Sequence, residues 1–216
     1  MSSELPLLIV ITDWQIPASK LMESLESVLS LGPEVALQHR HPGASDRVFF
    51  EEGERLAKLC QRLGNPLFVN GRLDIALLLG AHLHLPARGI AFDDVRRHVF
   101  PGTWISAAVH DRQEALEAVG ADLALVSPVF APGSKPTDPR TPLGPEGFAR
   151  LAKSTPCPAF ALGGIGPANA SEVVGASGFS AISSVLKASN PILAAKALLS
   201  AARKSRQRPH PTSTSD

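Results

Sequence analysis

The sequence predicts a single (β/α)8 barrel over residues 1–203, and two observations lead to this fold class. Short runs that are almost entirely apolar alternate with longer segments in which apolar residues recur at helical spacing. Strands that are apolar throughout are typical of a parallel sheet with both faces buried. The alternation occurs eight times in 216 residues, which is the number of units that closes such a barrel.

The eight units follow one another along the chain. The expected strands cover residues 7–13, 34–40, 66–71, 81–86, 103–110, 121–130, 157–164 and 178–186. The expected helices cover residues 17–32, 45–64, 72–80, 91–100, 111–120, 145–154, 166–177 and the segment from 191 onward. Gly64 is expected to end the second helix and Asp111 to cap the fifth. An open doubly wound sheet is the alternative, but it requires a glycine-rich loop after the first strand, and none is present.

Residues 204–216 form a polar tail without apolar periodicity, and we expect it to be disordered. Asn70-Gly71 lies between two apolar runs, a pattern that often marks a β-hairpin. In a parallel barrel it is instead a strand-to-helix loop, on the face where active sites of this fold are built.

Composition limits the classes of partner. With 44% hydrophobic and 19% charged residues, the chain has enough apolar side chains for a large core. Its 21 basic and 20 acidic side chains give a net charge of +1, so no bulk field attracts nucleic acid or an anionic membrane. We expect neither partner, and an anionic small molecule needs a local site. A homo-oligomer stays open, because eight amphipathic helices single out no exposed apolar face.

The expected location is cytoplasmic. The N-terminal segment lacks a basic leader followed by a long apolar stretch, so we expect no secretory signal, and no run approaches the length of a membrane span. Cys60 and Cys157 lie far apart and form no metal-type pair. We expect both to be core thiols in a reducing compartment.

Polar residues gather where the expected strands end, and in a barrel these ends converge on one mouth. They are Thr12, Asp13, Gln38, His39, Arg40, His41, Asn70, Gly71, Arg72, His84, His110, Ser134, Lys135, Gly163, Gly164, Ser183 and Ser184. Such a set of amides, histidines and hydroxyls suits a small heteroaromatic or carbonyl compound that carries an anion.

The anion is expected at the ends of the last two strands. Gly163 and Gly164 lack side chains, so their backbone N–H groups can approach a ligand, while Ser183 and Ser184 add hydroxyls and further amides. The loops after these strands are the recurrent phosphate site of the fold. The alternative is structural, with glycines that allow a tight turn and serines that cap a helix.

Four further residues are candidates for substrate binding. Arg40 ends a buried strand, where an unpaired charge is costly, so we expect it to face a ligand anion or an acid such as Asp13. The amides of Gln38 and Asn70 follow the same logic, with a purely structural role as the alternative. Lys135, on the longest loop, is either a lid residue or a solvated lysine.

His110 is the candidate acid or base, because the pKa of histidine lies near neutrality and its imidazole can take and return a proton. A helix cap or a packed core residue is the alternative. His39, His41, His82 and His84 do not have the spacing of a zinc site, which needs three or four converging ligands. We therefore expect no metal.

Several segments together resemble the thiamine-phosphate synthase and thiazole tautomerase (TenI) family. They are VALQHR, FVNGRLDIALLLGAHLHLP, AAVHDRQEALEAVGADLALVSPVF, the GSK loop, AFALGGI and AISSVL, in order between Leu7 and Leu199. The resemblance implies a (β/α)8 barrel, in agreement with the prediction above. It also implies one of two activities. The synthase joins an aminopyrimidine pyrophosphate to a thiazole phosphate with Mg²⁺, whereas the tautomerase isomerises a thiazole carboxylate phosphate without metal and uses a histidine after the fifth strand.

The residues match the two activities unequally. Gln38, Arg40, Asn70, Arg72, Ser134 and Lys135 match the substrate-binding motifs, and Gly163, Gly164, Ser183 and Ser184 match the thiazole phosphate half. Gly71 replaces a metal-binding aspartate, Pro42 a lysine and Pro132 a threonine. A second aspartate position falls on Gly89, and residues 86–89 hold no acid.

These departures favour a metal-independent thiazole tautomerase, because a pyrophosphate leaving group develops charge that a divalent cation normally neutralises. In this hypothesis His110 moves protons, the four phosphate-binding residues hold thiazole phosphate and no cofactor is needed. One alternative is a thiamine-phosphate synthase with Mg²⁺ at a rebuilt site, built from Asp13, Asp74 or Asp93. The other is a non-catalytic binder of thiazole or thiamine phosphate.

Overall fold

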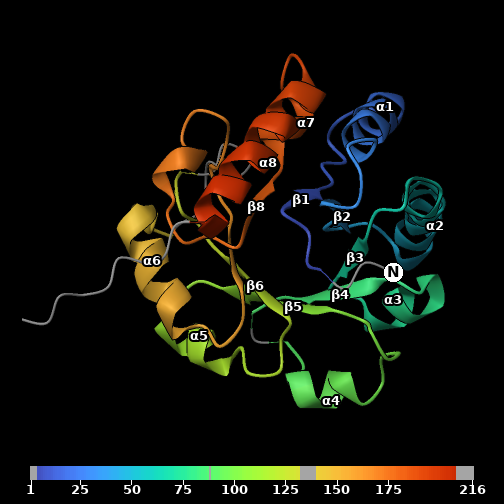
Figure 1. The fold of residues 1–216 in the computed structure, drawn as a ribbon. Coiled ribbons are helices and arrows are strands. Elements are labelled where there is room, and N and C mark those ends of the chain that lie inside the picture. Colours follow the sequence, from blue (N-terminus) through green and yellow to red (C-terminus); the bar gives the residue numbers. More distant parts are fainter. Residues whose placement is uncertain (1–3, 88, 132–139, 208–216) are drawn as a thin grey trace, which may run out of the picture.

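A computed structural model describes residues 4–87, 89–131 and 140–207. Its eight strands form a closed parallel barrel in sequential order, with the last strand paired to the first (Figure 1). The predicted (β/α)8 barrel is therefore confirmed. The strands are β1 (Leu8–Ile11), β2 (Val35–His39), β3 (Leu67–Asn70), β4 (His82–Leu85), β5 (Ile105–Val109), β6 (Leu123–Val126), β7 (Ala159–Ala161) and β8 (Gly178–Ala181).

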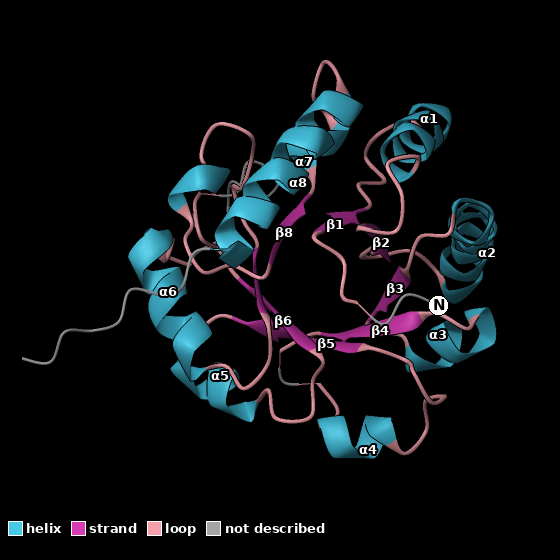
Figure 2. Ribbon diagram, viewed as in Figure 1, coloured by secondary structure: helices cyan, strands magenta, loops and turns pink. Residues whose placement is uncertain are grey.

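The helices surround the strands as an outer layer (Figure 2). They are α1 (Ala18–Leu29), α2 (Asp46–Leu63), α3 (Leu73–Leu79), α4 (Phe92–Arg96), α5 (Arg112–Glu117), α6 (Gly144–Ser154), α7 (Ser183–Leu186) and α8 (Pro191–Gln207), with a 3₁₀ turn at Ala170–Glu172. Within the described ranges, no helix has both the length and the apolar character to cross a membrane.

Two local signals act as expected. Gly64 ends α2 with a φ of 77°, a left-handed conformation that glycine adopts without strain. The Asp111 side chain accepts a hydrogen bond from the backbone N–H of Glu114 and so caps α5.

A cluster of apolar side chains, here called the interior plug, fills the inside of the barrel. It shows which strand residues face inward. Ile9, Ala36, Phe68, Leu125 and Phe160 are buried in one cluster and all come from strands. Successive side chains of a strand point to opposite faces, so the residues two and four positions after a plug residue also face inward, closer to the mouth. This alternation separates the mouth residues from those that face the helices.

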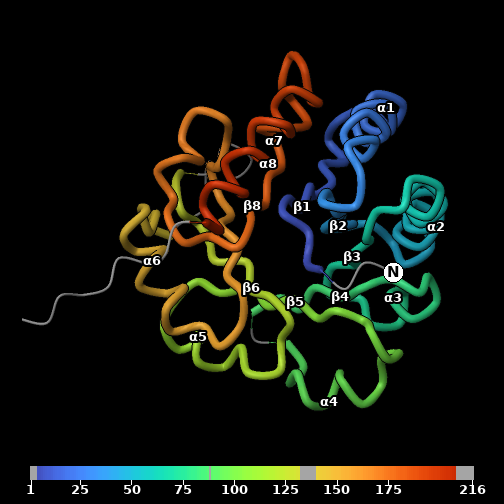
Figure 3. The backbone as a smooth tube through the Cα atoms, viewed as in Figure 1, coloured from blue at the N-terminus to red at the C-terminus, as the bar shows by residue number. Residues whose placement is uncertain are grey.

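Three elements differ from the sequence prediction. The expected eighth strand stops at Ala181, where its pairing with β1 ends, and Ser183–Leu186 instead forms the helical turn α7. The expected helix over 166–177 is reduced to the turn Ala170–Glu172, because α8 packs against this segment and against β8 and α1. Figure 3 shows α8 beside β8, on the outer side of the barrel. The helix also continues to Gln207, beyond the expected barrel boundary at 203.

Candidate active site

Side chains from β2 enter the mouth in alternation. Gln38 and Arg40 lie two and four positions after Ala36 of the interior plug, so they face inward, and Gln38 is buried. His39 faces the opposite way: it is fully buried against α2, and its Nε2 lies 2.9 Å from the carbonyl oxygen of Phe49. Burial lowers the pKa of His39 to about 4, so its imidazole is neutral.

The ends of β3, β4 and β5 add a second group of inward side chains. Asn70 is paired in register with His84, and His84 with Ser106. The Nδ1 atom of His84 lies 2.7 Å from the hydroxyl of Ser106, and both residues are buried. Burial lowers the pKa of His84 to about 3, and the charges of Arg40 and His110 add to this effect. A neutral imidazole therefore lies near the Arg40 guanidinium.

Thr12 at the end of β1 holds the backbone of Arg40. Its hydroxyl donates to the Arg40 carbonyl at 2.9 Å and accepts from the Arg40 N–H at 2.9 Å. Burial lowers the pKa of Arg40. In the part of the chain that the structure describes, no carboxylate forms an ion pair with this guanidinium.

The expected acidic partner of Arg40 is bound elsewhere. Asp13 forms a 2.8 Å ion pair with Lys187, which directly follows α7. That part of the prediction is therefore wrong, and Arg40 is left to face the mouth. Arg72 does not serve the mouth either, because its guanidinium binds Asp46 and Asp74, each at 2.7 Å.

His110 lies two positions after the inward Ala108 at the end of β5 and is fixed by Glu114 of α5. One carboxylate oxygen of Glu114 lies 2.7 Å from His110 Nδ1 and accepts the His110 backbone N–H at 2.8 Å. Glu114 therefore fixes the ring, and the other ring nitrogen, Nε2, has no hydrogen-bond partner among the described residues.

His41 lies outside this mouth. Its Nδ1 is 2.9 Å from the buried carboxylate of Glu52, and its ring stacks on Trp14 with 5.5 Å between centroids. Together with His39, it ties the β1–α1 and β2–α2 loops to α2. A structural role therefore accounts for both histidines, although sequence position alone places them with the mouth residues.

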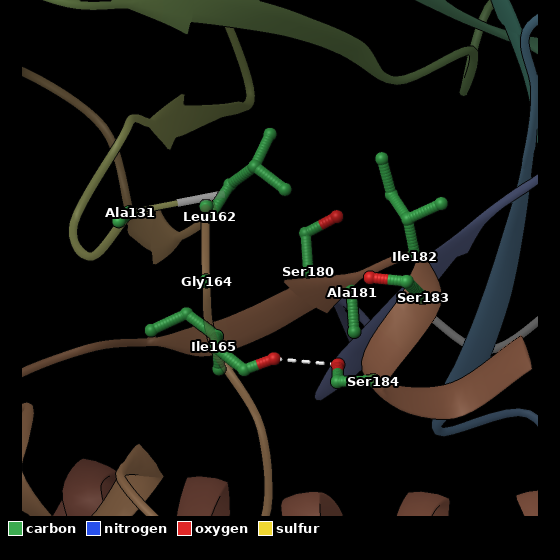
Figure 4. A pocket seen from close by; sticks show the side chains of 10 residues that line it. Ala131, Leu162, Gly164, Ile165, Ser180, Ala181, Ile182, Ser183 and Ser184 are labelled. Atoms are coloured by element: carbon green, nitrogen blue, oxygen red, sulfur yellow. Dashed lines mark hydrogen bonds between the residues drawn. The ribbon is translucent and has the colours of Figure 1, made fainter. Parts of the chain in front are cut away.

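A cavity of about 260 Å³ lies at the ends of β7 and β8 (Figure 4). It is lined by Ala131, Leu162, Gly163, Gly164, Ile165, Ser180, Ala181, Ile182, Ser183 and Ser184. All four predicted phosphate-binding residues are therefore brought together in one concave site.

The two glycines are required by close packing as well as by conformation. Gly163 and Gly164 have φ values of 94° and 63°. A Cβ on Gly163 would lie 2.7 Å from Pro128 Cα, and one on Gly164 would lie 2.7 Å from the Ala131 carbonyl oxygen. The structural explanation considered for these glycines therefore holds, and the same bare backbone forms the wall of the cavity.

The two serines have different roles. The Ser184 hydroxyl donates to the Ile165 carbonyl at 2.5 Å, so it joins the two loops (Figure 4). The Ser183 hydroxyl has no hydrogen-bond partner among the described residues. The backbone N–H groups of Gly164 and Ser183 likewise donate to no other described group, so all three are available to an anion.

Ser134 and Lys135, the two predicted binding residues of the long loop, lie outside the described residues. Sequence reasoning missed Ser106, Glu114 and Lys187. Two of these carry a usable signal: Ser106 is a polar residue within an apolar strand, and Glu114 lies four positions after His110. Nothing in the sequence pairs Lys187 with Asp13.

The residues present do not fit the Mg²⁺ site that the resemblance implies. Mg²⁺ prefers oxygen ligands, chiefly carboxylates. Of the acids suggested for a rebuilt site, Asp13 and Asp74 are held by Lys187 and Arg72, and Asp93 is exposed on the outer helix α4. Over the described ranges, no group of three or more histidine, cysteine, aspartate or glutamate residues can hold a metal ion.

Comparisons with known proteins agree on one family. The family model described as "Thiamine monophosphate synthase" matches residues 8–185. The chain is 33% identical to the thiamine-phosphate synthase of Chloroflexus aurantiacus over 198 residues, which cover 88% of this chain and 90% of that protein. It is 34% identical to the thiamine-phosphate synthase of Roseiflexus castenholzii over 194 residues, with 88% and 85% covered.

A solved structure, the thiamine phosphate pyrophosphorylase from Pyrococcus furiosus, is also similar, with a TM-score of 0.79 and 31% identity over 92% of this chain and 96% of that one. These relatives contradict the hypothesis of a thiazole tautomerase, since they are synthases. That hypothesis gave the substitutions at Gly71 and Gly89 more weight than agreement along the whole barrel. The chain belongs to the thiamine monophosphate synthase family.

Proposed function

We propose that this protein is a thiamine-phosphate synthase, a transferase that joins thiazole phosphate to an aminopyrimidine pyrophosphate and releases pyrophosphate. The relatives named above support this reaction. The observation that carries it is the presence of two anion-binding features in one barrel mouth, the cavity at β7 and β8 and the guanidinium of Arg40. A substrate pair with two separate phosphorylated groups requires both.

The cavity is the proposed site for thiazole phosphate. Its available N–H groups and the Ser183 hydroxyl supply hydrogen-bond donors, and its glycine wall lets an anion approach the backbone closely. The amides of Gln38 and Asn70 are proposed to bind the pyrimidine substrate, because neither side chain forms a hydrogen bond within the described chain. Arg40 is proposed to face its pyrophosphate.

The proposed reaction is a substitution at the methylene carbon of the pyrimidine substrate. The ring nitrogen of the thiazole forms a C–N bond as the C–O bond to pyrophosphate breaks, and pyrophosphate leaves with the electron pair. Positioning of the two rings and stabilisation of the leaving charge are the tasks of the protein. We further propose a reducing, cytoplasmic location, supported by the free thiols of Cys60 and Cys157, whose pKa values burial raises to about 12.

The test is incubation of the purified chain with both substrates, followed by separate quantification of thiamine phosphate and of pyrophosphate. We expect the two products in equal amounts. Ser183→Ala should raise the KM for thiazole phosphate by roughly 10-fold, since it removes one donor to a charged group. Ser171→Ala, at an exposed serine outside the cavity, is the matched control and should leave the KM unchanged. Formation of neither product would refute the proposed reaction.

A further inference from the structure

The guanidinium of Arg40 is the feature of the mouth that the thiazole phosphate site leaves unexplained. It is partly buried, and its backbone is fixed by the two hydrogen bonds to Thr12. In the described chain it has no carboxylate partner, although burying an unpaired guanidinium costs free energy. The charge therefore calls for an anion that the described residues do not supply.

Three acids near the mouth already have side-chain partners among the described residues. Asp13 is bound by Lys187 at 2.8 Å, and Glu114 by His110 at 2.7 Å. Asp74, after β3, is bound by Arg72 at 2.7 Å. Recruiting any of them as a metal ligand would break an existing ion pair and leave a cation without its partner.

We infer that the second phosphorylated group of the substrates binds beside Arg40 through protein cations and amides, with no divalent cation between them. The assignment of that group as pyrophosphate rests on the proposed function, whereas the cationic character of the mouth does not. The reasons are the unpaired Arg40, the committed acids and the lack of any metal-holding group among the described residues. In this site the Arg40 guanidinium stabilises the negative charge of the phosphorylated group, a role that a bound Mg²⁺ would otherwise have.

Gly71 shows that packing does not prevent a carboxylate at this edge. Its φ is 72°, a conformation that aspartate and asparagine tolerate better than most residues, and an added Cβ would meet only Pro86, at 3.8 Å. At Gly89, in contrast, an added Cβ would lie 3.0 Å from the Pro86 carbonyl oxygen. Position 71 is therefore the place where a metal-binding carboxylate can be introduced and compared with the natural chain.

The first experiment is isothermal titration of the EDTA-treated full chain with inorganic pyrophosphate, with and without added Mg²⁺. We expect binding without metal and less than about a threefold change in Kd on adding Mg²⁺. Arg40→Gln should weaken the metal-free binding about 10- to 100-fold, as expected for the loss of hydrogen bonds to a charged group. Arg47→Gln removes the same charge from an exposed position in the first turn of α2 and should leave the Kd unchanged.

The second experiment compares Gly71→Asp with Gly71→Asn, two side chains of the same shape that differ in charge. The aspartate should weaken metal-free pyrophosphate binding, because it adds a negative charge just after β3, which pairs with the strand that precedes Arg40, and Mg²⁺ should restore the affinity. The asparagine variant should show neither effect. Circular dichroism and thermal unfolding establish that each variant is folded before titration.

Three results would overturn the inference. Pyrophosphate binding by the natural chain that requires Mg²⁺ is the first, and equal Kd values for Arg40→Gln and Arg47→Gln are the second. The third is an equal gain from Mg²⁺ in the natural chain and in Gly71→Asp. The two proposals fail separately: metal-free, Arg40-dependent binding without formation of thiamine phosphate refutes only the proposed function. Synthase activity with Mg²⁺-dependent binding refutes only this inference.

Discussion

The carboxylate of Asp13 lies 2.8 Å from the ammonium of Lys187 and so joins the loop after β1 to the end of α7. The ion pair lies across the junction between the first and last strands of the barrel. Since Asp13 is bound there, it does not neutralise Arg40, and the guanidinium stays available to the mouth. This contact thus lies where β8 pairs with β1 and leaves Arg40 without Asp13 as a partner.

The two members of this pair should respond differently to substitution. The Asp13 side chain is 11% exposed and that of Lys187 is 45% exposed. Lys187→Met leaves a mostly buried carboxylate without its cation and should lower the free energy of unfolding by about 1 kcal/mol or more. Asp13→Asn leaves a lysine that water can solvate and should cost about 0.5 kcal/mol or less. Urea unfolding measures the loss of stability in both variants. Equal losses would contradict the difference in exposure between the two side chains.

Gly164 should be far less tolerant of substitution than a glycine that needs only its positive φ. Gly164→Ala places a Cβ 2.7 Å from the Ala131 carbonyl oxygen, whereas Gly32, with a φ of 101°, has nothing within 4 Å of an added Cβ. Gly32→Ala should cost about 1 kcal/mol of stability. Gly164→Ala should cost at least about 2 kcal/mol and should also weaken binding of thiazole phosphate. If thermal unfolding gave similar losses of stability for the two variants, the close packing of Gly164 against Ala131 would be refuted.

Acid should destabilise the barrel through His39, which is buried, and His82, which is half-buried. Burial lowers the pKa values of His39 and His82 to about 4, from an ordinary value of 6.5. Between pH 6.5 and 4 the unfolded chain takes up protons that the folded chain does not, so the free energy of unfolding falls by about 1.4 kcal/mol per pH unit for each histidine. Above pH 6.5 this effect vanishes.

The pH prediction is tested with the double variant His39→Gln/His82→Asn, whose amides keep one hydrogen bond of each ring but do not titrate. Urea unfolding at several pH values between 7.5 and 4.5 should show a flatter acid decline than in the natural chain. His98→Asn, at an exposed histidine after α4, is the control and should leave the slope unchanged. A double variant with an unaltered slope would rule out these two groups as the source.

Glu114 should matter for activity more than for folding. Its carboxylate contacts both the ring and the backbone N–H of His110, at 2.7 and 2.8 Å. Glu114→Ala frees the imidazole to rotate at the barrel mouth, where the proposed function places both substrates, and should lower kcat for thiamine phosphate formation by about tenfold. The cost in stability should stay near 1 kcal/mol, because both residues keep some exposure. Glu117→Ala, at an exposed glutamate of the same helix, should leave kcat unchanged.

The sequence predicted the strand ends that form the mouth better than it predicted which of their residues face it. Gln38 and Arg40 enter the mouth, whereas His39 faces α2. The sequence also could not assign Asp13 to Lys187 instead of Arg40. Ion pairs of this kind join residues far apart along the chain, and side-chain charge alone does not choose among several partners.

What the sequence by itself determined was the fold and the end of the barrel that carries the site, because hydrophobic periodicity is local and repeats in every unit. It also identified the segments proposed to bind phosphate, since glycines and serines at two successive strand ends can be recognised in the sequence alone. Only the tertiary structure decided the face of each side chain, the replacement of the last strand segment by the turn α7, and the pairing of Asp13 with Lys187. The last two depend on barrel closure, which pairs β8 with β1 and brings Lys187 beside Asp13.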